Sequence, residues 1–226
     1  MNKIGDLVKR PIKEGSLLYF ISILHAWIRC LECCLHISYR LTIKHSYGAY
    51  SAEQKKKMNE QEKEVKENLK EGLGLHVDKV KPGGYGNTND GNMSRRFFEN
   101  PSRTAELTGL NAIFLERVRV ILVVLSSMFV ADIEAFRAYC LETARQYVDL
   151  YSWYWMPCAV HKILLHAADE MKVAPVPIGL LSEEPLESCH KKLKHYRKHH
   201  TRLCNRTAGN TDLLRGLLVA KLCSVS

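Results

Sequence analysis

The stretch LLYFISILHAWIRCLECCLHISYRLTIKH, residues 17–45, predicts the fold class. Its apolar side chains recur at helical spacing around nearly the whole circumference, so we expect a helix at the centre of the protein. A membrane span needs roughly 18 uninterrupted apolar residues, and this stretch is interrupted well before that length. The ionisable residues that interrupt it are His25, Arg29, Glu32 and His36. The stretch indicates a buried amphipathic helix, and a membrane-associated protein built on residues 17–41 is the lesser alternative.

The rest of the chain carries further helix signals and no alternation long enough for a sheet. Residues 111–131 and 132–156 have helical periodicity. The β-branched run at 118–124 resembles a buried strand, but its length and the charges beside it favour a helix. Ser51, followed three residues later by Gln54, predicts a capping box at the start of another helix. We therefore expect an all-α chain, or the α part of a larger fold.

Shifts in composition divide the chain into segments. Gly72 and Gly74 predict the end of the helix that Ser51 begins. KVKPGGYGNTNDGN, residues 79–92, forms the clearest loop. The expected segments are a polar tail at 1–16, a helical hairpin at 17–78, a Gly/Asn loop and helical region at 79–175, a terminal helix with a basic face at 176–206, and a divergent tail at 207–226.

Charge and cysteine usage narrow the class of partner. A net charge of +9 and a pI near 9.1 favour a polyanion such as nucleic acid, or an acidic membrane surface. Eight cysteines are present, but the polar start MNKIGDLVKRPIKEGS has no features of a secretory signal peptide. We therefore expect reduced thiols in an intracellular protein.

The stretch PIGLLSEEPLESCHKKLKHYRKHHTR, residues 177–202, places glutamates before the most cationic part of the chain. Glu187 is followed at roughly i+4, i+7 and i+11 by cations, so one helical face carries a carboxylate and then a ladder of positive charge. A carboxylate that holds a metal beside cations that hold phosphates would explain this pattern. A solvated basic helix with acids at its N-terminal end explains it equally well.

Three other motifs carry possible chemistry. His161 and His166 are five residues apart, about 140° around a helix, so spacing alone favours two ordinary helix histidines over a shared metal. Cys30 and Cys33 lie one turn apart and could bind zinc, but a lone pair in an apolar helix is usually core. GGYGNTNDGNMSRRFF offers backbone donors and two guanidinium groups to an anion, and a plain flexible loop is as good an interpretation.

The order of these pieces resembles a known family. LHAWIRCLECCLHISYRLTIK, GNTNDGNMSRRFF, AFRAYCLETARQYVDLYSWYWMPCAVHKILLHA and PIGLLSEEPLESCHKKLKHYRKHHTR follow one another in this chain. This order resembles the C-terminal part of the large, catalytic subunit of the V(D)J recombinase and its Transib-type transposase relatives, over most of residues 23–206. The most specific part is the histidine pair followed by IG, by SE, and by Glu-Ser before a basic helix.

The resemblance implies a site. In the family, two aspartates and a glutamate on an RNase H-like core hold two divalent metals that activate water and then a DNA 3′ hydroxyl. It implies that Glu187 is that glutamate, with Glu183 or Glu184 as alternatives because one extra residue follows SE. It also implies that His161 and His166 bind zinc. The implied DNA contacts are Asn92, Arg95, Arg96, Lys191, Lys194, Arg197, Lys198 and Arg202.

The chain also departs from the family. The family's two aspartates and its zinc-binding cysteine pair lie upstream of the first matching block. Cys30 and Cys33 fall inside that block, where the family has no cysteine ligands. We therefore expect one of three catalytic acids and two of four zinc ligands: an incomplete structural zinc site, and magnesium or a similar metal only if the missing acids are supplied.

The expected fold is all-α, comprising the helical insertion and last catalytic-core helix of an RNase H-like recombinase without the sheet. The expected function is DNA binding by a fragment of a recombinase- or transposase-like endonuclease that is not catalytic alone. Expected partners are DNA and either the missing N-terminal part of the same protein or a second copy, with no membrane and a nuclear location. The alternative is a domesticated or remnant helical protein with no catalysis and only nucleic-acid or protein contacts.

Overall fold

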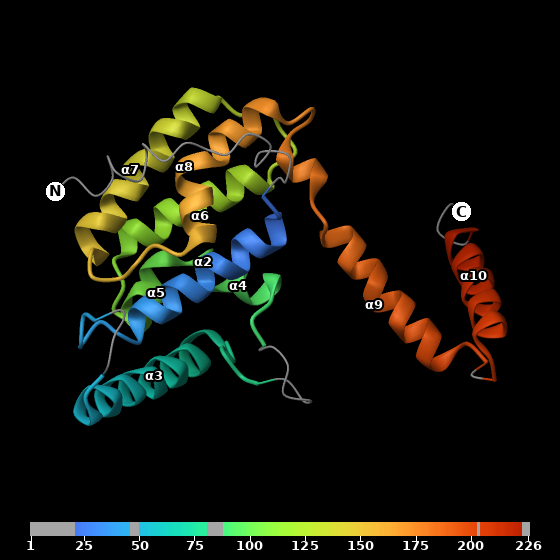
Figure 1. Cartoon of the computed structure of the whole chain (residues 1–226), viewed down its shortest axis with the longest axis horizontal. Coiled ribbons are helices and arrows are strands. Elements are labelled where there is room, and N and C mark those ends of the chain that lie inside the picture. Colours follow the sequence, from blue (N-terminus) through green and yellow to red (C-terminus); the bar gives the residue numbers. More distant parts are fainter. Residues whose placement is uncertain (1–20, 46–49, 81–87, 203, 223–226) are drawn as a thin grey trace. The chain divides into compact units, whose positions relative to one another are not determined.

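The computed structural model describes residues 21–45, 50–80, 88–202 and 204–222, but not the side chains of 184–188, 191 and 217–222. Within these ranges the regular elements are helices and there is no strand, so the all-α expectation is confirmed (Figure 1). The elements are α2 (Ile23–Ser38), α3 (Ala52–Leu73), α4 (Gly91–Glu99), α5 (Pro101–Thr108), α6 (Ala112–Ser126), α7 (Ile133–Tyr151), α8 (Cys158–Val173), the 3-10 helix η2 (Ile178–Leu181), α9 (Glu184–His199) and α10 (Arg206–Leu222).

Two compact units divide the chain, Met1–Ser182 and Glu183–Ser226. Helices α2 to α8 and η2 belong to the first unit, and α9 and α10 form the second. The residues classed as the hydrophobic core all belong to the first unit.

Helix α2 is the central element of the first unit, as the apolar stretch predicts. Ser22 caps it, because the serine side chain accepts a hydrogen bond from the His25 backbone N–H. The helix packs against α3, α4, α6 and α8 (Figure 1). In the described part of the chain, no helix combines the length and apolarity needed to cross a bilayer. The buried residues of α2 are Ile23, Ala26, Trp27, Cys30, Leu31, Cys33, Cys34, Leu35, Ile37 and Ser38.

Helix α3 lies at the outside of this unit, and capping residues determine where it begins and ends. The predicted capping box is confirmed, since the Ser51 and Gln54 side chains each accept a hydrogen bond from the other's backbone N–H. Gly74 ends the helix in the left-handed conformation, with φ of 63°. Only Val65 and Leu69 of this helix are buried, so α3 covers α5 and α2 with a thin apolar stripe.

Helices α6, α7 and α8 complete the first unit around α2. Phe114 of α6 meets Tyr147 and Tyr151 of α7 in edge-to-face contacts, with ring centres 5.8 and 5.4 Å apart. The indole N–H of Trp27 donates to the Ser126 hydroxyl at 2.8 Å, which joins α2 to the end of α6. Gly179 of η2 lies against the same end of α6.

Three helices are shorter than their apolar patterns. Residues 17–45 form a helix only over Ile23–Ser38, with 17–20 outside the described residues. The helix expected at 111–131 ends at Ser126, where Ser127 turns to an extended conformation. The helix expected at 132–156 covers Ile133–Tyr151. Apolar periodicity reports burial, whereas the ends of a helix depend on its caps and on tertiary contacts.

Candidate functional site

The histidine pair lies on α8. The His161 and His166 rings are tilted by 58° with their centres 5.1 Å apart. The spacing of about 140° around the helix favoured two ordinary helix histidines over a shared metal, and the rings nevertheless lie close together. An imidazole extends well beyond the helix cylinder, so its side-chain torsions can bring rings on neighbouring turns together.

The pair's surroundings mix burial with charge. His166 is partly buried, and burial lowers its pKa from the ordinary value, against the attraction of Asp169. The Nδ1 atom of His166 lies 4.0 Å from an Asp169 carboxylate oxygen. The other oxygen of Asp169 lies 2.8 Å from the Arg137 guanidinium of α7. A lowered histidine pKa favours the neutral imidazole, which is the form that ligates metals.

Metal ligation by this pair would need partners from elsewhere. Two imidazoles on one tetrahedral zinc, each bound at about 2.1 Å, have ring centres roughly 5 Å apart. The separation of His161 and His166 fits that arrangement, and it also fits a plain aromatic contact. Within the ranges that the structure describes, no group of three or more His, Cys, Asp or Glu side chains is placed to share an ion. Cys30 and Cys33 lie in the core of α2, both buried.

Helix α4 carries the three predicted phosphate contacts of the first unit. Asn92 is exposed. The Arg95 guanidinium lies over the Trp27 ring at 5.2 Å, which is a cation–π contact with the core helix. Arg96 donates to the carbonyl of Leu73 and so caps the C-terminal end of α3. Both arginines therefore support the fold, and their side chains point to different helices.

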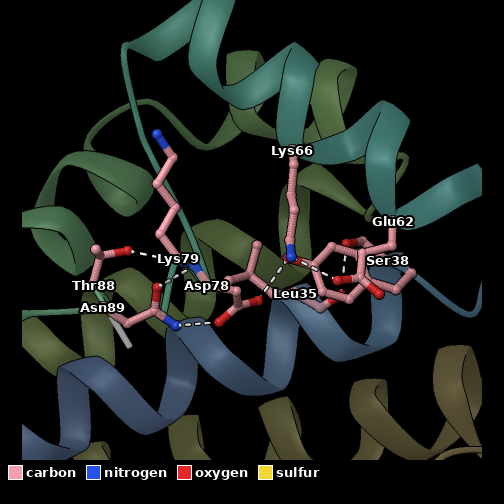
Figure 2. A network of polar contacts seen from close by, with 9 residues as sticks. Leu35, Ser38, Glu62, Lys66, Asp78, Lys79, Thr88 and Asn89 are labelled. Carbon is pink, nitrogen blue, oxygen red and sulfur yellow. Dashed lines mark hydrogen bonds and ion pairs between the residues drawn. The ribbon is translucent and has the colours of Figure 1, made fainter. Parts of the chain in front are cut away.

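The Gly/Asn loop before α4 is closed at its base by a polar network (Figure 2). Asn89 and Asp78 exchange two hydrogen bonds, of 2.6 and 2.9 Å. The backbones of Lys79 and Thr88 pair beside them at 2.9 Å. Asp78 also accepts a hydrogen bond of 2.8 Å from the Tyr39 hydroxyl, which ties the loop base to the residue after α2. The positions from 81 to 87, at the middle of the predicted loop, lie outside the described residues.

Helix α9 carries the basic residues of the second unit. Glu187 and Lys191 lie on it, but their side chains are outside the described part of the structure. Lys194 and Lys198 are exposed and one turn apart. Glu183, one alternative to Glu187, is the residue before the helix, and Glu184 is its first residue. The helix thus begins among carboxylates and ends with Arg197, Lys198 and His199 in its last turn, an order that suits the helix dipole.

Helix α10 packs against α9. A Cβ added at Gly216 would lie 2.7 Å from the Tyr196 ring, so this glycine lets the two helices approach closely. Arg202, just after α9, makes a bidentate contact with Asp212, with Nε and Nη2 each 3.0 Å from a carboxylate oxygen. The Arg202 backbone N–H donates to the same carboxylate at 3.0 Å. Arg202 therefore holds the α9–α10 turn, and its charge is offset by Asp212.

Sequence reasoning missed two features. Glu170 of α8 is fully buried; one of its oxygens accepts a 2.6 Å hydrogen bond from the Ile21 backbone N–H. The other oxygen meets the Lys162 ammonium at 2.8 Å as an ion pair without hydrogen-bond alignment. The second feature is α10, which lies in the segment expected as a divergent tail. Asn205, whose side chain accepts from the Ala208 N–H, is an N-cap signal that could have predicted it.

The predicted site residues thus fall into two groups. Asn92, Arg95, Arg96, His161 and His166 belong to the first unit, and Glu187 with the α9 cations belongs to the second. Of these residues, the structure brings together the two histidines. No protein-family model matches this chain, and no curated protein matches it either.

Proposed function

We propose that this chain binds duplex DNA, as part of a recombinase- or transposase-like protein similar to the large subunit of the V(D)J recombinase and the Transib transposases. In this proposal the helices of the first unit correspond to the helical insertion of an RNase H-like core, and α9 is the last core helix. The protein acts in the nucleus and does not cleave DNA by itself. The remaining parts of the site come from the rest of the same protein or from a second copy.

The observation that carries this proposal is the cationic segment 188–211 of the α9–α10 unit. Residues 188–211 contain seven lysines and arginines and no aspartate or glutamate. Lys192, Lys194 and Lys198 are exposed on α9. Cations gathered on one exposed helix replace the counterions of a DNA backbone, and the release of those counterions drives binding. An equal number of cations spread over the whole surface would give a weaker local field.

In this proposal the chain supplies only some of the ligands that the family's metal sites need. His161 and His166 would supply two zinc ligands, because neutral imidazoles at this separation fit one tetrahedral ion. Glu187 would supply one carboxylate to a pair of divalent metals such as magnesium, which in the family activate water and a DNA 3′ hydroxyl. One carboxylate does not hold two metals against water, so catalysis depends on acids that a partner supplies.

The test is the salt dependence of binding to a fluorescent 20-base-pair duplex, measured by anisotropy with the full chain. We expect affinity to fall steeply between 50 and 200 mM salt, on the order of a hundredfold or more. The double substitution Lys194→Glu with Lys198→Glu should weaken binding by at least about tenfold on every duplex sequence, and lower the salt slope by about 2.

The matched control reverses two exposed lysines of α3. Lys55→Glu with Lys63→Glu changes the net charge equally but lies in a helix where acids and bases are mixed. We expect this control to weaken DNA binding by less than about threefold, through the general field alone. The proposal is contradicted if the affinity for duplex DNA does not depend on salt concentration. It is also contradicted if the two double variants weaken binding equally.

Protein contact alone is the second candidate function. Its support is an apolar surface on the loop between α6 and α7, where Met128, Phe129 and Val130 are 66%, 81% and 89% exposed. Of these residues, Phe129 and Val130 border a hollow of about 170 Å³ that Ile133 and Met171 help to line. Exposed apolar clusters of this kind mark protein interfaces. A wild-type chain that binds no DNA but self-associates in sedimentation velocity, with association lost in Phe129→Ser, would favour this candidate.

A further inference from the structure

A hollow of about 440 Å³ opens at the turn between α9 and α10. Among the described residues, its lining contains three arginines, namely Arg197, Arg202 and Arg206, and no acidic residue. The remaining polar residues of the lining are Thr201, Asn205 and Asn210. The size is within the range of small-ligand sites, and the charge selects the sign of the ligand.

The three arginines differ in how far their charge is already offset. Arg202 is engaged by Asp212 through two side-chain contacts of 3.0 Å, and this hydrogen bonding lowers the pKa of Asp212 to about 2. The Asp212 carboxylate therefore stays ionised near neutral pH and neutralises Arg202. Arg202 shapes the rim of the hollow and contributes little net charge to it.

Arg197 and Arg206 differ from Arg202 in their partners. The Arg197 Nη2 donates to the Asn210 amide oxygen at 3.2 Å, and an amide orients a guanidinium without neutralising it. Arg206 is exposed and makes no ion pair with any residue that the structure describes. Two guanidinium groups without an ion-pair partner among the described residues thus border one concave surface, and an anion bound there would supply the counter-charge.

The two asparagines add donors rather than acceptors. The Asn210 amide oxygen already accepts from Arg197, and the Asn205 amide oxygen accepts from the Ala208 N–H at 2.8 Å. Each asparagine therefore keeps its NH₂ group as the part able to bind a ligand. A lining of guanidinium and amide donors matches the oxygens of a phosphate.

We infer that this hollow is a phosphate-binding site, in which Arg197 and Arg206 grip a phosphate group while the Arg202–Asp212 pair holds the turn in shape. The inference rests on the proposed function for the origin of that phosphate, which would be one backbone phosphate of bound DNA. Free phosphate has the same chemistry and is the other possible source. Because the lining is formed by α9, α10 and the turn between them, the site needs no residue from the first unit.

The test compares full-length variants in the duplex-binding measurement at 100 mM salt. We expect Arg206→Gln and Arg197→Gln each to weaken binding about tenfold, the effect of losing one charge-assisted contact. Arg215→Gln is the matched control, since Arg215 is an exposed arginine of α10 outside the hollow. It should weaken binding less than about twofold. The affinity of Arg206→Lys should lie between those of the wild type and Arg206→Gln, because lysine keeps the positive charge but lacks the bidentate geometry of a guanidinium group.

A second arm separates the two phosphate sources. At fixed ionic strength, chloride is replaced by inorganic phosphate, and the side-chain amide signals of Asn205 and Asn210 are followed by NMR. Phosphate-dependent shifts that vanish in Arg206→Gln establish an anion site, even if the wild type binds no DNA and the proposed function fails. Unchanged amides together with a loss specific to the Arg197 and Arg206 variants establish a site for DNA phosphate only. The inference is overturned if the amides do not respond and these variants bind DNA as the Arg215 control does.

Discussion

At the scale of single residues, the cysteines show how strongly burial controls chemistry. Burial raises the pKa of the Cys33 thiol to about 12, and raises those of Cys30 and Cys34 as well. The Cys33 sulfur also lies 3.8 Å from the Tyr147 hydroxyl inside the core. Their spacing in CLECC would allow zinc binding, but the sequence favoured a place in the core, and a thiol that resists ionisation there is a poor ligand and a poor nucleophile. Packing, rather than redox or metal chemistry, accounts for these residues.

The thiols should therefore fall into two classes of reactivity. A pKa near 12 leaves roughly a thousandth of the thiolate that an ordinary thiol has at pH 8. We expect iodoacetamide to alkylate the exposed Cys158, Cys189 and Cys204 of the native protein within minutes, and to leave Cys30 and Cys33 unmodified. Peptide mass spectrometry reads each site, and labelling in 6 M guanidinium provides the control. Alkylation of Cys33 at the rate of Cys158 would show that the core opens readily.

The sequence could single out candidate site residues by local motifs, but it could not predict the contacts that these residues make. The histidine pair was singled out by a resemblance to a family motif, while the approach of its rings to 5.1 Å depends on torsions that spacing does not give. Arg95 and Arg96 look alike in the sequence, but their roles follow from what lies beside them: the Trp27 ring for one, the Leu73 carbonyl for the other. The pairing of Arg202 with Asp212 depends on an unforeseen helix.

At the scale of elements, end signals predicted better than apolar patterns. The capping box of Ser51 and the left-handed Gly74 were both readable, because each acts through its own few atoms. The end of α6 at Ser126 was not readable, since apolar residues resume after Ser126 and Ser127 and extend to Val130. That end is determined by tertiary contact, where Trp27 binds Ser126 and η2 packs against the carbonyls beyond it.

Substitution of Gly179 should destabilise the contact between η2 and the end of α6. A Cβ at this position would collide with the Ser127 carbonyl oxygen and would lie 2.6 Å from that of Ser126. Backbone atoms at the end of a packed helix cannot rotate away, so we expect Gly179→Ala to lower the free energy of unfolding by about 2–3 kcal/mol. Chemical denaturation followed by circular dichroism at 222 nm measures this change.

Gly72→Ala is the matched control for that substitution. A Cβ there meets the terminal methyls of Leu107, at 2.7 and 2.9 Å, and these can rotate aside. Alanine also favours the helical conformation that Gly72 adopts within α3. We expect an effect within about 1 kcal/mol of zero, of either sign. Equal destabilisation by the two substitutions would mean that the contact of η2 with α6 contributes nothing particular.

At the scale of the whole molecule, the two units differ in what holds them together. The first unit has a continuous core that includes Leu31, Phe97 and Leu122, each fully buried. In the second unit, none of the residues whose side chains are described is buried. The α9–α10 pair is instead joined by the Arg202–Asp212 contact and by Tyr196 against Gly216. Two helices whose described side chains include no buried residue gain little stability from packing, so a ligand that bridges them adds a large share of their stability.

Hydrogen exchange should therefore show whether duplex DNA binds to α9 and α10. Without ligand, we expect the amides of α9 and α10 to exchange within seconds to minutes, while those of α2 and α6 stay protected far longer because their opening requires loss of the core. A saturating duplex should slow exchange in α9 and α10 roughly tenfold to a hundredfold, since binding at 10 to 100 times Kd stabilises the bound conformation by that factor. Peptide-resolved mass spectrometry at low salt measures both states.

The Arg206→Gln variant is the control that connects this protection to the hollow. If phosphate bridges α9 and α10 through Arg197 and Arg206, the variant should lose most of the protection at the turn even when enough duplex is added to saturate it. Protection that is complete in the variant would mean that DNA contacts only the exposed α9 lysines Lys192, Lys194 and Lys198. Protection that spreads to α4 and α8 instead of α9 and α10 would move the interface to the first unit, and would contradict the assignment of binding to the basic helix.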